Sequence, residues 1–94
     1  MNLIDFAKRL TADQQVTVEE NRPLVYSTVK KYFGRLPRTV REDLEDEAKL
    51  ALIRATIKYN PDLGWKYSTY VVASILNACL RFAQRRMREM ATST

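Results

Sequence analysis

The stretch that decides the fold is DLEDEAKLALIRA, residues 43–55. Its apolar residues recur at the spacing of one helix face, and this spacing predicts a helix over residues 40–59. The expected inner face consists of Val40, Leu44, Ala48, Ala51, Leu52, Ala55 and Tyr59. The opposite side is expected to carry Glu42, Asp46, Lys49 and Ile53, with Asp43 and Glu47 flanking it.

The chain before this stretch has three further helical patterns. Apolar spacing over residues 2–10 predicts a short first helix, and a capping box that begins at Thr11 predicts a second one reaching about Asn21. Because proline interrupts helices but fits their first turn, Pro23 is expected to begin a new helix. Gly34 is expected to end it.

After a turn at residues 60–64, a last helix capped by Ser68 or Thr69 is predicted to run to about Met90. Its inner stripe includes Cys79, which is expected to be a buried, inert thiol. No long stretch alternates with period two. We therefore predict an all-α fold, a single compact domain of four or five helices spanning residues 1–94.

The composition excludes several kinds of active site. The 94 residues include no histidine and one cysteine, which rules out imidazole acid–base chemistry, histidine zinc sites and an internal disulfide. There is no glycine-rich phosphate loop and no nucleophile elbow. We expect a protein that is not an enzyme, binds no cofactor or metal, has no membrane span and resides in the cytoplasm.

Charge is distributed unevenly along the chain. The net charge is +5, yet residues 42–47 contain five acids and no base, so the remainder carries sixteen bases against six acids, or +10. A basic body favours a polyanion such as nucleic acid, and a concentrated acidic patch favours a basic protein partner. The alternative is that these charges serve solubility.

Three groups of residues are candidates for binding. Asp43, Asp46 and Glu47 share a helix surface, which could be merely solvated, receive a basic partner helix or hold Mg²⁺. The segment WKYSTY, residues 65–70, combines aromatic rings and a lysine as single-strand binding sites do, although its tyrosines could instead pack into the core. A third group, suited to DNA phosphates or simply to a soluble helix end, consists of Arg81, Arg85 and Arg88.

Together, residues 43–55, the turn KYNP at 58–61 and the segment GWKYSTY at 64–70 resemble region 2 of bacterial sigma-70-type transcription initiation factors. The resemblance covers residues 20–82. It leaves residues 1–19 as an N-terminal helical extension and 83–94 as a basic helix end and tail. The resemblance implies a sigma-like subunit that binds RNA polymerase core and −10-like promoter DNA.

The family's motif assigns separate roles to matching positions. Those that would dock on the clamp helices of the largest catalytic polymerase subunit are Asp43, Asp46, Glu47, Lys49 and Ile53. Those that would bind the non-template strand of the −10 element are Tyr59, Trp65, Lys66, Tyr67, Thr69, Tyr70 and Asn77. Beyond them, Arg81, Arg85 and Arg88 would follow DNA phosphates.

One departure from the family concerns strand opening. Where primary sigma factors carry a pair of tryptophans that wedge the duplex open, this sequence has Ala73 and Ser74. This difference keeps two alternatives open: a co-sigma or decoy that occupies the polymerase without opening DNA, and a basic DNA-binding module with no polymerase partner. The native-looking start and polar end favour a complete small protein, with a second sigma-like chain supplying −35 contacts.

Overall fold

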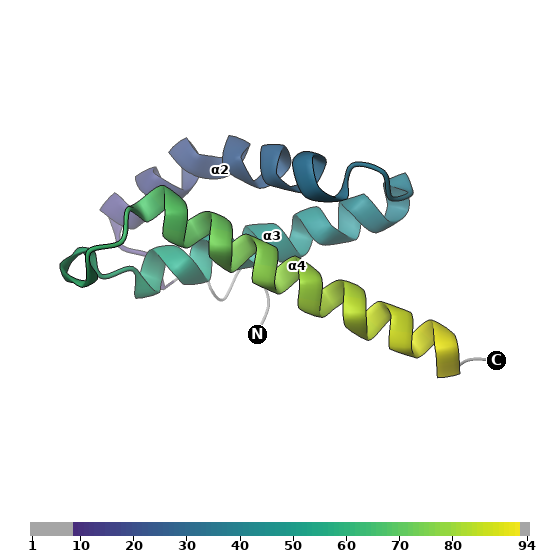
Figure 1. The fold of residues 1–94 in the computed structure, drawn as a ribbon. Helices are drawn as coiled ribbons and strands as arrows, with labels where there is room; N and C mark the ends of the chain where they lie inside the picture. Colours follow the sequence, from purple (N-terminus) through teal and green to yellow (C-terminus); the bar gives the residue numbers. More distant parts are fainter. Residues whose placement is uncertain (1–8, 93–94) are drawn as a thin grey trace.

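The computed structural model describes residues 9–92 and is helical almost throughout. The elements are α2 (Ala12–Phe33), α3 (Arg38–Lys58), the short 3₁₀ helix η1 (Pro61–Leu63) and α4 (Tyr67–Thr92) (Figure 1). No strand occurs within residues 9–92, so the predicted all-α class is confirmed. The predicted number of four or five helices is wrong for this part of the chain, which has three α-helices.

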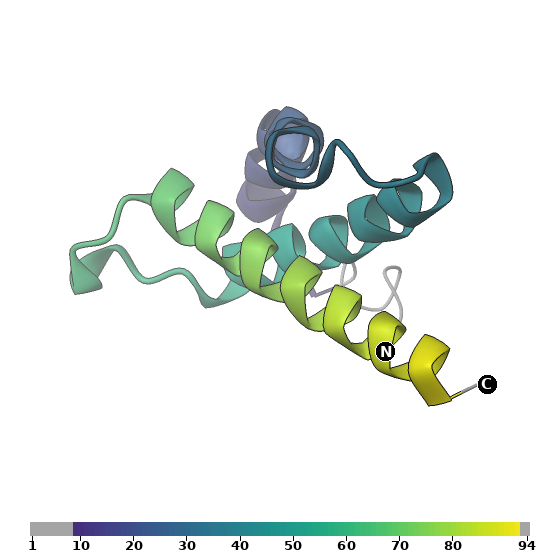
Figure 2. The ribbon, with the colours of Figure 1, turned by 45° about the vertical axis from the view of Figure 1, so that its right-hand side comes forward.

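Helix α3 is the centre of the arrangement and packs against both α2 and α4. Figures 1 and 2 show α2 lying across one side of the other two helices. The C-terminal turns of α4 project beyond the body in both views. The molecule is accordingly elongated, with extents of 47 × 26 × 23 Å.

The core lies where the three helices meet. Leu44 and Leu52 of α3 and Ile75 of α4 are almost completely buried. Burying a side chain of this size contributes about 1.5–3 kcal/mol. The remaining core positions are small or β-branched, which lets the helix backbones approach closely: Val18, Val25, Val29, Ala48, Ala51, Ile53, Ala55, Val71, Ala78 and Cys79.

Helix α2 differs from the prediction of two helices separated at Pro23. It is continuous from Ala12 to Phe33 with Pro23 inside it. Its buried residues Val18, Val25 and Val29 lie on both sides of the proline and continue one stripe, whereas Pro23 itself is exposed. Packing of that stripe against α3 therefore outweighs the loss of one helical hydrogen bond. The predicted capping box is confirmed, since Thr11 and Gln14 exchange hydrogen bonds of 3.2 and 2.9 Å.

The helix predicted over residues 2–10 falls largely outside the described residues. Its described part, Arg9 and Leu10, is not helical. Helix α4 begins at Tyr67, so Ser68 and Thr69 lie inside its first turn and their prediction as caps is wrong. No helix in the described part of the chain combines the length and the apolar character of a membrane span.

Candidate functional site

The acidic face of α3, formed by Asp43, Asp46 and Glu47, is linked to nearby basic residues. Asp46 has the most exposed side chain and lies 3.8 Å from the amine of Lys49. The guanidinium of Arg86, from the projecting part of α4, donates a 2.8 Å hydrogen bond to Asp43. Glu47 is half-buried beneath α4. The described residues contain no group of three acidic or cysteine side chains placed to hold a metal ion.

Of the other two predicted docking residues, Lys49 is half-buried, with its amine over the ring of Tyr26 at 5.4 Å. Ile53 belongs to the core and is 6% exposed. The prediction that Ile53 lies on the side opposite the core is wrong. Two helices, α2 and α4, cover α3, so a larger part of the circumference of α3 is buried than one helix face. Ile53 lines a hollow of about 300 Å³ between α2 and α3, together with Val18 and Leu10.

The predicted aromatic segment begins on the loop between α3 and α4. Asn60 accepts a 3.0 Å hydrogen bond from the backbone of Asp62, and Gly64 has a φ of 84°, the left-handed conformation that glycine adopts without strain. Trp65 follows with its side chain 61% exposed. Its carbonyl accepts a 2.6 Å hydrogen bond from the hydroxyl of Tyr59, which fixes the loop while leaving the indole in solvent.

Three tyrosines form a cluster behind this loop. The ring of Tyr59 meets that of Tyr67 edge to face at 5.3 Å and that of Tyr70 at 5.9 Å. The hydroxyls of Tyr67 and Thr56 are 2.6 Å apart, and Thr56 also donates to the carbonyl of Leu52 at 2.8 Å. Burial raises the pKa of Tyr67, and the hydrogen bond with Thr56 partly offsets that rise. Tyr67 and Tyr70 pack against the core, as the structural alternative for this segment supposed, whereas Trp65 is exposed and available for binding.

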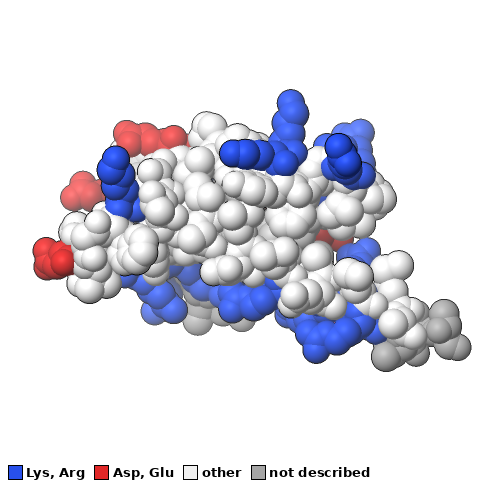
Figure 3. Space-filling model, viewed as in Figure 1, with Lys and Arg blue, Asp and Glu red and all other residues white. Residues whose placement is uncertain are grey.

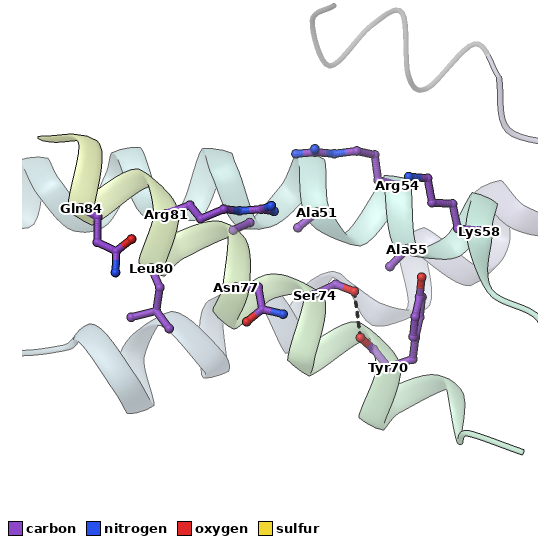
Figure 4. Close-up of a pocket in the computed structure, with 11 residues that line it drawn as sticks. Ala51, Arg54, Ala55, Lys58, Tyr70, Ser74, Asn77, Leu80, Arg81 and Gln84 are labelled. Carbon is purple, nitrogen blue, oxygen red and sulfur yellow. Dashed lines mark hydrogen bonds between the residues drawn. The ribbon is translucent and has the colours of Figure 1, made fainter. Parts of the chain in front are cut away.

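A groove of about 480 Å³ runs between α3 and α4. Alanines at 51, 55 and 78 leave room between the helices, and polar side chains surround the opening (Figure 4). The predicted DNA-binding residues Tyr70, Asn77 and Arg81 all line it. Three further polar lining residues were not among the predicted binding residues: Arg54, Lys58 and Gln84.

The groove continues along α4 as a second hollow of about 360 Å³ that shares Arg54 and Arg81 with it. The predicted cations Arg85 and Arg88 line this part, opposite Glu47. Figure 3 shows the basic side chains gathered along this lower edge of the molecule. Arg54 and Lys58 are four residues apart, a spacing that places both on one helix face and could have identified them from the sequence. Their position beside the arginines of α4 depends on the packing of α3 against α4.

Of the remaining predicted DNA-binding residues, Lys66 and Thr69 are exposed at the start of α4. Ala73 is exposed as well, whereas Ser74 is half-buried and donates a 3.0 Å hydrogen bond to the carbonyl of Tyr70. No bulky ring stands at either of these two positions. Of the two, only Ser74 lines the groove.

Cys79 lies inside this region and is fully buried. Its thiol is 3.6 Å from the carbonyl of Leu44. Burial, with a smaller contribution from the carboxylate of Glu47, raises the pKa of Cys79 to about 11. The predicted burial of Cys79 is therefore confirmed, and its thiol is protonated at neutral pH.

The model of the family "Sigma-70 region 2" matches residues 17–89, which include α3, α4, the loop between them and most of α2. The chain belongs to the sigma-70 region 2 family. It is 37% identical over 83 residues to the RNA polymerase sigma factor SigA of Synechocystis sp. (strain ATCC 27184 / PCC 6803 / Kazusa), covering 85% of this chain and 19% of that protein.

Two further sigma factors show the same relationship. SigA of Nostoc sp. (strain PCC 7120) is 41% identical over 64 residues, 68% of this chain and 16% of that protein. SigA2 of Synechococcus elongatus is 33% identical over 91 residues, 94% of this chain and 28% of that protein. The chain thus spans less than a third of the length of these relatives. No solved structure matched it.

Proposed function

We propose that this chain is a non-catalytic, sigma-like transcription initiation subunit. It binds RNA polymerase core through the acidic face and −10-like promoter DNA through Trp65 and the α3–α4 groove. The observation that carries the proposal is the match to sigma-70 region 2 over residues 17–89. The presence of both an acidic face and a basic, aromatic groove agrees with two partners of opposite charge.

For the polymerase, the proposed contact is with the basic clamp helices of the largest catalytic subunit. Asp46 is the most accessible carboxylate of the acidic face, and Asp43 becomes available when Arg86 releases it. Lys49 supports Asp46 from the same turn. Because Ile53 is buried, we assign it to the packing of α2 on α3, and its contribution to docking acts through the position of α3.

For DNA, the proposed path of the non-template strand begins at the exposed indole of Trp65 and enters the groove at Tyr70. Bases that leave the duplex stack on aromatic rings, while Arg54, Lys58 and Arg81 lie close enough to the groove to hold phosphates. Lys66, Thr69 and Asn77 border the same path. A second sigma-like chain would supply the upstream contacts at the −35 element.

The polymerase half of the proposal is tested by titrating the chain against sigma-free polymerase core. The variant Asp43→Lys/Glu47→Lys is expected to weaken binding by about tenfold or more, because it places two cations against a basic partner. The control Asp13→Lys/Glu20→Lys changes the net charge equally on the exposed side of α2. Equal affinity of both variants would contradict docking through the acidic face and leave a basic DNA-binding module as the better account.

A co-sigma or decoy role is the second candidate, favoured by the small side chains at positions 73 and 74. Transcription from a duplex promoter and from one with an unpaired −10 region separates the two roles. A sigma-like subunit supports initiation on at least the unpaired template. A decoy supports neither and lowers the output of another sigma factor added to the same reaction.

A further inference from the structure

The turn between α2 and α3 is the most basic part of the sequence that the proposed function does not use. Residues 30–41 contain five cations and no acid. This turn joins the C-terminal end of α2 to the start of α3, whereas the loop that carries Trp65 follows the other end of α3 (Figure 1). Figure 3 shows a second group of basic side chains at this end of the molecule.

The turn borders an open hollow of about 700 Å³. Its lining combines cations with apolar and aromatic groups, among them Lys30, Lys31, Tyr32, Arg35, Leu36 and Arg41. The turn is tight: Leu36 donates a 3.1 Å backbone hydrogen bond to Phe33. A Cβ at Gly34 would come within 2.4 Å of the carbonyl oxygen of Lys30, so glycine is required for this shape.

Most of the positive charge in this hollow is not neutralised within the molecule. Arg38 pairs with Glu42 at 3.1 Å, and Lys31 lies over the ring of Tyr32 at 5.3 Å. Among the described residues, no carboxylate lies within ion-pair distance of Lys30, Arg35 or Arg41. The buried Nε of Arg41 also has no hydrogen-bond partner there.

The start of α3 adds to the positive potential. Helices usually carry a side-chain cap and acids in their first turn, since both complement the positive end of the helix dipole. Helix α3 follows Pro37 without a side-chain cap and has no acid in its first turn, but begins with Arg38 and has Arg41 three residues later. Because neither a cap nor an acid compensates the positive end of the helix dipole, the start of α3 favours an anion supplied by another molecule.

We propose that this hollow is a second nucleic-acid site, one that takes single-stranded nucleic acid. Lys30, Arg35 and Arg41 bind phosphates, and the ring of Tyr32, 51% exposed, receives a base. A surface that binds only the phosphates of a duplex needs cations alone. This hollow combines cations that lack an ion-pair partner within the described part of the molecule with an exposed ring, which can stack on an unpaired base. The inference goes beyond the proposed function and involves none of its binding residues.

Trp65, where the proposed path of the strand begins, and the turn between α2 and α3 lie beyond opposite ends of α3. Its 21 residues at 1.5 Å each span about 30 Å. At about 3.4 Å per nucleotide in a stacked strand, one strand reaching from Trp65 to the turn needs about nine nucleotides. A six-nucleotide strand is therefore too short to contact Trp65 and the turn at the same time.

The test is fluorescence anisotropy with labelled six- and twenty-nucleotide single strands and a twenty-base-pair duplex. It is performed in a Trp65→Ala background, which weakens the first site but leaves the cations of its groove in place. The second site is therefore reported by the change in affinity that each substitution in the turn produces in this background. Lys30→Gln/Arg35→Gln is expected to weaken single-strand binding by about tenfold or more and to reduce the slope of log affinity against log salt by about 1.4. Tyr32→Ala is expected to weaken it by about five- to hundredfold.

The matched control is Arg9→Gln/Arg22→Gln, which removes one cation before α2 and one at the middle of α2. Circular dichroism verifies the fold of each variant. An equal loss in Lys30→Gln/Arg35→Gln and in the control overturns the site, because the binding would then reflect net charge alone. Tyr32→Ala with unchanged affinity, or a duplex bound at least as tightly as the single strand, overturns the single-strand assignment. Polymerase binding is measured in parallel, so that failure of the proposed function is distinguished from failure of this inference.

Discussion

Arg86 donates a 2.8 Å hydrogen bond to Asp43 across 43 residues of sequence, and so joins the projecting end of α4 to the acidic face of α3. Both side chains are about two-fifths exposed. A partner that uses Asp43 must therefore compete with a cation that the chain itself supplies. The acidic face and the basic end of α4 are parts of one electrostatic arrangement and not two independent surfaces.

We predict that Arg86→Gln changes folding and docking in opposite directions. Exposed ion pairs contribute about 0.2–1 kcal/mol, so the free energy of unfolding in urea falls by no more than this. Polymerase affinity is expected to rise by up to about fivefold, because Asp43 no longer has to leave Arg86. The neighbouring Arg85→Gln, with the same change in charge, is the control. If Arg86→Gln raises polymerase affinity no more than Arg85→Gln does, Asp43 is not part of the docking surface.

A second prediction concerns the hydrogen bond between Thr56 and Tyr67. Tyr67→Phe removes one hydroxyl and leaves Thr56 bonded to Leu52, so the free energy of unfolding is expected to fall by about 0.5–1.5 kcal/mol. Thr56→Val removes the partner of a half-buried hydroxyl and is expected to cost about 1–2 kcal/mol. A double-mutant cycle in urea is expected to give a coupling energy of about 1 kcal/mol. Strict additivity would show that the 2.6 Å contact contributes nothing to stability.

A third prediction follows from the pKa of Cys79. In the folded chain this pKa is about 11, above the ordinary value of 9.0, because burial disfavours the thiolate. The contribution to stability is therefore complete below about pH 9 and is lost as the pH rises towards 11, a total of about 2–3 kcal/mol. Urea unfolding between pH 8 and 11 is expected to show this additional loss relative to Cys79→Ala. Parallel pH profiles for the two proteins would contradict it.

The helices could be predicted where apolar residues recur at helical spacing along one buried face. Leu44, Ala48 and Leu52 recur at helical spacing, and all three are buried in α3. Pro23 was misleading, since its cost to a helix is local, whereas the packing of Val18 and Val25 on either side depends on a distant partner. Ile53 was misplaced for a related reason: a single helical wheel cannot show that two helices cover α3.

The candidate site was predictable in its residue types and less so in its geometry. The exposed indole of Trp65 and the surface carboxylate of Asp46 lie where sequence reasoning put them. The contribution of Arg54 to the groove depends on the packing of α3 against α4, and the pairing of Asp43 with Arg86 depends on how far α4 extends. Such contacts between distant residues have no local signature in the sequence.

The last prediction separates the aromatic residues that bind from those that hold the fold. Trp65→Ala removes a 61% exposed ring but keeps the carbonyl that accepts from Tyr59, so the free energy of unfolding is expected to change by less than about 0.5 kcal/mol. Tyr70→Ala removes a ring packed on the core and is expected to cost about 2–3 kcal/mol. Both are measured by urea unfolding.

The same variants are then bound, with polymerase core, to a promoter fragment whose −10 region is single-stranded. Trp65→Ala is expected to weaken this binding by about five- to hundredfold while the fold is unchanged. Tyr59→Phe is the matched control: it keeps the indole and removes the 2.6 Å hydrogen bond that anchors the loop, so a smaller loss is expected. If Trp65→Ala binds like the unaltered chain, the exposed ring does not contact the strand, and DNA engagement would rest on the groove alone.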